Sequence, residues 1–235
     1  MTRLLGCDFS SSPSTRKSIV LAWGAWRDKR LVLEGLQACT SLVAFEQALH
    51  TPGPWVGGFD LPFGLPRELV TTLQWPLSWK ECIDHFATLS REQIRDTFKA
   101  FCDNRPAGGK FAHRATDIPA GSSPSMKWVN PPVAYMLHAG VPLMLQAGLD
   151  FPGLYAGDTQ RVALEAYPGW VARQLIGSRS YKSDDKAKQT PDRLIARKDI
   201  LHGLVSGQAG ATLYLRPAQH DALAQDASGD KLDAV

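Results

Sequence analysis

Residues 3–12 read RLLGCDFSSS and residues 55–64 read WVGGFDLPFG, and these two stretches decide the fold. Each is a mostly apolar run that ends in one aspartate, Asp8 or Asp60, before a turn rich in Ser, Pro or Gly. Short apolar runs with such boundaries are typical of buried strands. A carboxylate at the end of a buried strand is unfavourable unless it is paired or binds a cation. We therefore expect two strands that each bring an acid to the ligand-binding edge of a sheet.

The rest of the first sixty residues predicts an α/β arrangement. Three strands follow one another so closely that antiparallel hairpins are favoured, and a helix then returns the chain to a fourth strand parallel to the first. A side-chain oxygen of Thr or Ser can cap the N-terminus of this helix. The expected elements are strands at 3–9, 17–25, 30–36 and 55–59, and a helix that Thr40 or Ser41 caps and that runs to about His50.

The segment from 61 to about 158 departs from this pattern and reads as a helical insertion over one end of the sheet. Prolines interrupt it, and its loop of Pro, Gly, Ser and basic residues is a candidate lid. The expected elements are a helix with a Ser90–Gln93 capping box that ends near Phe101, the loop 104–127, and a helix over 130–147 that is broken near Gly140 and Pro142.

The α/β pattern resumes after the insertion, so we expect a single domain over residues 1–235. A fifth strand carries Glu165, and prolines in the first turn mark the helices that follow. The expected elements are a strand at 161–166, a helix from Pro168, a helix that begins at Thr190–Pro191–Asp192 and ends at Val205, and a last helix from Ser228.

Composition leaves several classes of protein open and removes others. The net charge of +3 permits a polyanionic ligand without requiring one. The four cysteines are far apart, which argues against a zinc site and favours reduced thiols. We find no apolar run long enough for a membrane helix and no signal-peptide core, and we expect a cytoplasmic protein that does not bind a membrane. The phosphate-binding motifs GxxxxGK[ST] and GxGxxG and the GxSxG motif of serine nucleophiles are also missing.

Five acids are the candidates for catalysis: Asp8, Asp60, Glu165, Asp230 and Asp233. The first two end strands, although a turn acid is the simpler alternative for each. The last two lie three residues apart on the final helix, so both can reach one face, and Asp230 also suits the helix N-terminus. Asp233 lies between apolar neighbours and lacks that explanation. Glu165 could be a further ligand or the partner of an arginine.

Such carboxylates favour a hard divalent cation, Mg²⁺ or Mn²⁺, with Asp8, Asp60 and Asp233 as the metal ligands. Two ions about 3.5–4 Å apart would activate a water and stabilise a leaving oxygen in phosphoryl chemistry. Arg114 and Lys182 lie in long polar loops and could hold phosphate oxygens, as could Ser10 and Ser11. For most single basic residues of this sequence, a solvated surface charge is the simpler interpretation.

Four motifs together resemble a known family. GCDFSSSPSTRKSI, GFDLPFGLP, EAYPGWVARQL with the following SYKSDD, and GDKLDA are similar to motifs of bacterial domain-of-unknown-function family 429, predicted nucleases with a ribonuclease H-like fold. The resemblance spans nearly the whole chain. It implies a mixed five-stranded sheet whose first three strands are antiparallel, with helices around it. It also implies acids on the first strand, the fourth strand and the last helix, at Asp8, Asp60 and Asp233 with Asp230.

Three functions remain open from the sequence. The first is a metal-dependent nuclease that hydrolyses DNA or RNA. The second is a phosphotransferase or ATPase of the actin and sugar-kinase type, because DFSSS can resemble a first phosphate loop, although we find no second loop. The third is a catalytically silent binding protein on the same fold, which the weak net charge permits.

Overall fold

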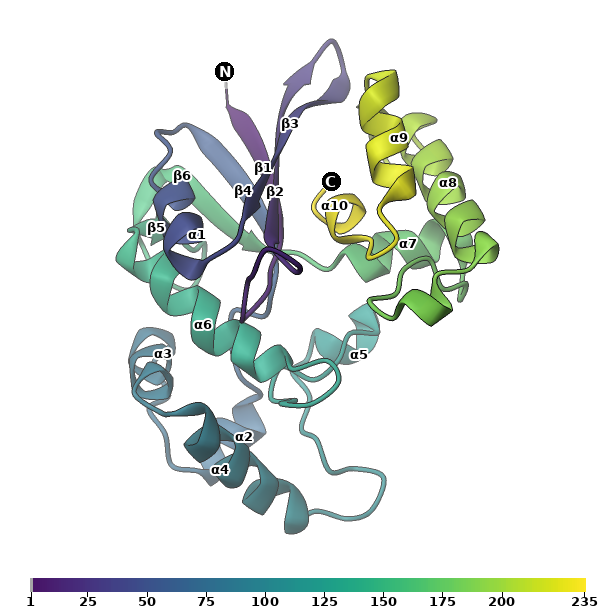
Figure 1. Ribbon diagram of the computed structural model, residues 1–235. Helices are drawn as coiled ribbons and strands as arrows, with labels where there is room; N and C mark the ends of the chain where they lie inside the picture. Colours follow the sequence, from purple (N-terminus) through teal and green to yellow (C-terminus); the bar gives the residue numbers. More distant parts are fainter. Residues whose placement is uncertain (1) are drawn as a thin grey trace.

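The protein is an α/β structure built around one mixed sheet of seven strands. A computed structural model describes residues 2–235. The strands lie in the order β5-β6-β4-β1-β2-β3-β7, with helices on both faces (Figure 1). Within the described residues, no helix combines the length and the apolar character needed to cross a membrane.

The bounds of the elements are as follows. The strands are β1 (Arg3–Asp8), β2 (Ile19–Arg27), β3 (Arg30–Cys39), β4 (Trp55–Asp60), β5 (Leu149–Asp150), β6 (Asp158–Glu165) and β7 (Thr212–Tyr214). The helices are α1 (Leu42–Leu49), α2 (Arg67–Thr72), α3 (Trp79–Ala87), α4 (Arg91–Asp103), α5 (Asp117–Ala120), α6 (Val133–Gln146), α7 (Pro168–Ile176), α8 (Pro191–Val205), α9 (Pro217–Gln225) and α10 (Asp230–Asp233), and a 3-10 turn covers Lys186–Lys188.

The pairing of the first four strands is the predicted one. β1, β2 and β3 form an antiparallel meander, and α1 carries the chain to β4, which is parallel to β1. β6 then pairs in parallel with β4. The predicted count of five strands is wrong, because β5 and β7 extend the two edges of the sheet. These edge strands have only two and three residues, too few to show a period of alternation in a sequence.

Most of the predicted local signals hold, and one fails. Ser41 caps α1, and the capping box of Ser90 and Gln93 begins α4. The predicted break near Pro142 is wrong, since α6 is one helix that contains this proline. A proline removes one backbone donor, and here the packing of α6 on the sheet outweighs that loss. The last helix begins at Asp230 and not at the predicted Ser228, and α9 was not predicted although Pro217 lies in its first turn.

Alternation along the strands divides the apolar residues between two cores. Ile19, Leu21 and Trp23 of β2 join a large core beneath α1, α6 and the rest of the insertion. Val20 and Ala22 face the other way, into a second core under α7, α8, α9 and α10. The same alternation governs β1 and β4, so their even-numbered residues face the α10 side.

The helical insertion predicted at 61–158 comprises α2 to α6 and β5. In Figure 1 it extends below the sheet, at the end where β1 and β4 finish. α6 covers one face of the sheet, while the stretch 104–132 passes below the strand ends and contains the four-residue α5. The candidate lid therefore lies next to the ends of the strands that carry Asp8 and Asp60.

Gly6 allows α10 to lie directly on β1, which makes a testable prediction. A Cβ atom at Gly6 would come within 1.9 Å of the backbone oxygen of Ala234, whereas one at Gly35 of β3 would meet nothing within 4 Å. We expect Gly6→Ala to destabilise the protein by about 1–3 kcal/mol, as overpacking does, and to lower the Tm by roughly 3–10 °C. Calorimetry should show Gly35→Ala within about 0.5 kcal/mol of wild type. Equal effects of the two variants would contradict the close packing.

Candidate metal centre

Asp8 and Asp60 are neighbours because β1 and β4 pair in parallel and in register. Asp8 lies directly opposite Asp60 in that pairing, and each is the last residue of its strand. Both occupy even positions, so both side chains point to the face that α10 covers. The two strand ends that look alike in the sequence thus deliver two carboxylates to one place.

Asp233 reaches the same place from the last helix. α10 follows Gly229, which has a φ of 80°. The Asp226 carboxylate accepts a hydrogen bond from the Lys231 backbone at 2.9 Å and so fixes the first turn. The close approach of Ala234 to Gly6 then places Asp233 over the end of β1.

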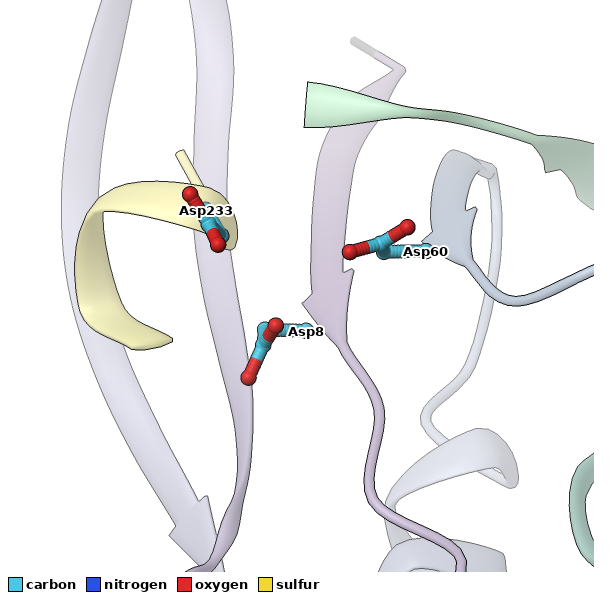
Figure 2. A group of neighbouring side chains, drawn as sticks. All are labelled: Asp8, Asp60 and Asp233. Atoms are coloured by element: carbon cyan, nitrogen blue, oxygen red, sulfur yellow. The ribbon is translucent and has the colours of Figure 1, made fainter. Parts of the chain in front are cut away.

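The three carboxylates form one compact cluster. Oxygens of Asp8, Asp60 and Asp233 all lie within 4.8 Å of one another, and Figure 2 shows them converging from β1, β4 and α10. Asp8 and Asp233 are each only 8% exposed. The side chains of Asp8 and Asp60 form no hydrogen bond or ion pair with any other part of residues 2–235.

Burial and mutual repulsion make these acids hard to ionise together. Burial, followed by the charges of Asp230 and Asp233, raises the pKa of Asp8 well above its ordinary value. Burial and the charge of Asp233 raise the pKa of Asp60 to about 7. Burial also raises the pKa of Asp233, although two hydrogen bonds to it act in the opposite direction. The cluster is therefore a site where a cation would relieve repulsion.

Lys182 and Tyr181 make those two hydrogen bonds. The Tyr181 hydroxyl donates to one oxygen of Asp233 at 2.7 Å, and the Lys182 ammonium donates to the other oxygen. Although burial acts against it, Asp233 raises the pKa of Lys182, so this side chain stays charged.

The loop that carries these two residues is held by α8. Arg197, which is buried, donates to the backbone oxygens of Tyr181 at 2.7 Å and Ala224 at 2.8 Å, and Arg193 donates to the backbone oxygen of Lys182. Two arginines on successive turns of α8 thus hold the backbone of Tyr181 and Lys182, the two residues whose side chains contact Asp233.

Asp230 lies beside the cluster but has its own partner. Its carboxylate accepts a hydrogen bond from the Lys17 ammonium at 2.6 Å, and Lys17 also contacts Asp184 at 2.9 Å. The structure places Asp230 near Asp8 without making it one of the three converging ligands.

Glu165 is the partner of an arginine. β6 pairs with β4 so that Glu165 lies opposite Phe59, one residue before Asp60, and its side chain therefore points to the other face. There it accepts two hydrogen bonds from Arg114, at 2.6 and 2.8 Å, and one from the Phe63 backbone at 2.9 Å. Arg114 also pairs with buried Asp117. Its guanidinium is thus engaged with carboxylates, which differs from the predicted role of holding phosphate.

The serine loop lies beside the cluster. Ser10 and Ser11 line the same cleft as Asp8 and Asp60. The backbone oxygen of Ser11 accepts a hydrogen bond from Arg91 at 2.6 Å, which ties this loop to α4. Both serine side chains are therefore placed where they could contact a ligand of the site.

Sequence reasoning missed the residues that act through Asp233. Tyr181 immediately precedes Lys182 in the SYKSDD loop, which is the only local signal it offered. Nothing in the sequence marked Arg197 as a buried side chain, since it sits in a helix with several exposed charges. Lys17 appeared as an ordinary basic residue after a serine loop.

We compared the chain with protein-family models, with curated proteins and with solved structures, and none of the three comparisons found a match. The chemistry of the site is therefore argued from its own geometry. Three carboxylates suit a hard divalent cation, which prefers oxygen ligands. Two of them lack any protein partner, and each oxygen of Asp233 keeps a second lone pair beside its hydrogen bond. The donor set fits a magnesium or manganese ion.

The raised pKa of Asp60 predicts how stability depends on pH when metal is removed. Its unfolded pKa is near 3.8 and its folded pKa is about 7, so the stability it contributes is full below pH 4 and is lost as the pH rises through 7. We expect Asp60→Asn to raise the Tm in a chelator-containing buffer by at least about 2 °C at pH 8, and much less at pH 4. Asp221→Asn, at a side chain that is 83% exposed, is the control and should show no such trend. A Tm difference between Asp60→Asn and wild type that does not grow with pH would contradict the repulsion.

Proposed function

We propose that this protein is a divalent-metal-dependent nuclease that hydrolyses phosphodiester bonds of DNA or RNA. The observation that carries the proposal is the convergence of Asp8, Asp60 and Asp233 within 4.8 Å at the end of the sheet. Buried acids without partners destabilise a fold, so their grouping in a cleft favours a cation-dependent role.

A ribonuclease H-like fold is part of the proposal. The five longer strands, with the first three antiparallel, agree with the arrangement that the sequence motifs imply. The acids come from the first strand, the fourth strand and the last helix, as that resemblance also implies. In this proposal β5 and β7 are additions at the sheet edges, and the segment 61–158 is an insertion after the fourth strand.

Magnesium or manganese, when bound, would supply positive charge to the phosphate and lower the pKa of a water. Asp8, Asp60 and Asp233 would hold the ion. Tyr181 and Lys182 orient Asp233 by occupying its two oxygens. Outer partners of this kind fix the direction of a ligand's lone pairs.

The reaction consumes one water. The water oxygen forms a bond to phosphorus and loses one proton, the bond from phosphorus to the leaving oxygen breaks, and the leaving oxygen takes up one proton. Lys182 borders the cleft and keeps its proton, so its ammonium can donate a hydrogen bond to a phosphate oxygen or to the leaving oxygen. Serine hydroxyls of the 10–12 loop can donate to the remaining oxygens.

Metal binding is the first test of this proposal. We expect millimolar Mn²⁺ to raise the Tm of wild type by several degrees, because an ion that binds only the folded state stabilises it, and to appear as anomalous density between the three aspartates. Asp8→Asn should lose both signals. Glu165→Gln is the matched control in the same cleft, and it should keep the metal. Wild type that shows neither signal would refute the proposal, and metal-dependent binding of ATP without diester cleavage would favour the phosphotransferase.

Lys182 provides a separate prediction about turnover. We expect Lys182→Gln to keep the metal, since the ion supplies positive charge to Asp233, and to lower kcat for a nucleic-acid substrate by about 10²-fold, as loss of a charged hydrogen-bond donor to the reacting oxygens does. Lys188→Gln, in the same loop and 68% exposed, should leave kcat unchanged. Steady-state kinetics at saturating Mg²⁺ would measure both. An unchanged kcat in Lys182→Gln would remove this side chain from the mechanism.

A further inference from the structure

The carboxylate cluster opens into a cleft of about 560 Å³. Its lining comes from the strand ends with Asp8 and Asp60, from the serine loop, and from residues of the insertion, among them Thr116 and Ser122. A cleft of this volume is within the range of sites that hold small ligands, about 300–1,000 Å³. A ligand of about one nucleotide would fill it.

The insertion is fastened over this cleft at several points. Arg114 joins the loop to Glu165 of β6 by two hydrogen bonds. Arg173 of α7 donates to the backbone oxygen of Ala120, in the loop. On the other side, Arg91 of α4 holds the serine loop through Ser11. These contacts hold the insertion and the serine loop beside the ends of β1 and β4, so a duplex would have to fit its second strand against them.

A second hollow adjoins the first. It has a volume of about 430 Å³ and lies between α7 and the loop that follows it. The two hollows share Asp60, Tyr167 and Lys182. The carboxylate of Asp60 and the ammonium of Lys182 therefore lie at the junction of the two hollows. Each hollow has room for one group of nucleoside size.

Most of the cations that line the two hollows are paired with carboxylates. The cations of the first are all paired: Lys17 with Asp230 and Asp184, Arg114 with Glu165 and Asp117, and Lys182 with Asp233. In the second hollow, Lys182 is shared with the first, Arg179 pairs with Asp199 at 2.7 Å, and Arg173 donates to the backbone oxygen of Ala120. Arg173 is thus the one cation there without a carboxylate partner among the described residues, and neither hollow offers a row of free cations for the backbone of a duplex.

The carboxylate of Asp8, one of the three proposed metal ligands, lines this cleft, so a ligand bound to the metal would lie in it. Asp8 is 8% exposed and lines the cleft, yet its carboxylate has no hydrogen-bond or ion-pair partner anywhere in residues 2–235. A buried polar group in that state is rare in proteins and calls for a partner from outside the chain.

We propose that the substrate is an unpaired phosphodiester, with the bond to be cleaved at the junction of the two hollows and a nucleoside-sized group on each side. This inference rests on the proposed function and narrows it, since it excludes duplex DNA and phosphate monoesters as preferred substrates. A dinucleotide and a single strand share this chemistry.

Binding measured by calorimetry tests the inference without depending on turnover. The protein is loaded with Ca²⁺ to slow cleavage, and the ligands are thymidine monophosphate, a thymidine dinucleotide, a single-stranded 12-mer, a circular single strand and a duplex of the 12-mer. We expect the dinucleotide and the linear single strand to bind at least 10-fold more tightly than the monophosphate and the duplex. Binding of the circular strand would mean that strand interiors enter, and its exclusion would mean that only ends do.

A tryptophan introduced into one hollow at a time tests whether each hollow binds one half of the substrate. Ser180→Trp in the second hollow and Ser123→Trp in the first should each weaken dinucleotide binding at least 10-fold while the Mn²⁺ affinity stays at the wild-type value. Gln208→Trp, on an exposed turn after α8, is the control for the added side chain and should change neither affinity.

The failure of this inference differs from the failure of the proposed function. Duplex that binds as tightly as the single strand, or a dinucleotide that binds no better than the monophosphate, would overturn the inference and leave a metal-dependent nuclease in place. Absence of cleavage of every diester by protein that has bound Mn²⁺ would overturn the proposed function.

Discussion

The in-register parallel pairing of β1 with β4 is the constraint on which the rest of the site depends. It sets Asp8 beside Asp60 on the face that α10 covers. A slip of one residue would turn Asp60 to the opposite face. β6 illustrates this consequence, because its last residue, Glu165, pairs one position earlier and points away from the cluster. The register is fixed in turn by the large core, where Trp55 and Phe59 of β4 are fully enclosed.

The cluster lowers the stability of the fold that builds it. Burial and like charges raise the pKa values of all three aspartates, so the protein holds charge in a place where its own residues compensate only part of it. Lys182 and Tyr181 satisfy Asp233 alone. Such local conflict is typical of functional sites, where the surrounding core supplies the stability that the site lacks. Here the opposing contribution comes from the aromatic core beneath α1 and α6.

Short-range signals in the sequence were sufficient for the five longer strands, for the caps of α1 and α4, and for the two acids that end β1 and β4. What escaped prediction depends on long-range geometry. The face on which Glu165 lies depends on a register that no local pattern encodes. The contact of Lys182 with Asp233 joins residues 51 positions apart, and Arg197 acts on backbone oxygens, which carry no sequence signal. Pro142 was misread because packing of α6 on the sheet overrides its local preference.

The ion pairs that close the cleft also determine what chemistry it can support. Arg114 is the cation best placed by its loop to meet a phosphate, yet it is committed to Glu165 and Asp117, and Lys17 is likewise committed to Asp230 and Asp184. These pairs hold the insertion and the serine loop in place, so releasing them to bind substrate would open the site. Apart from the Lys182 ammonium, positive charge for an incoming phosphate in this cleft must then come from outside the chain, at the position where Asp8 and Asp60 have no partner. In the proposed function, the same contacts that give the cleft its shape make its activity depend on metal.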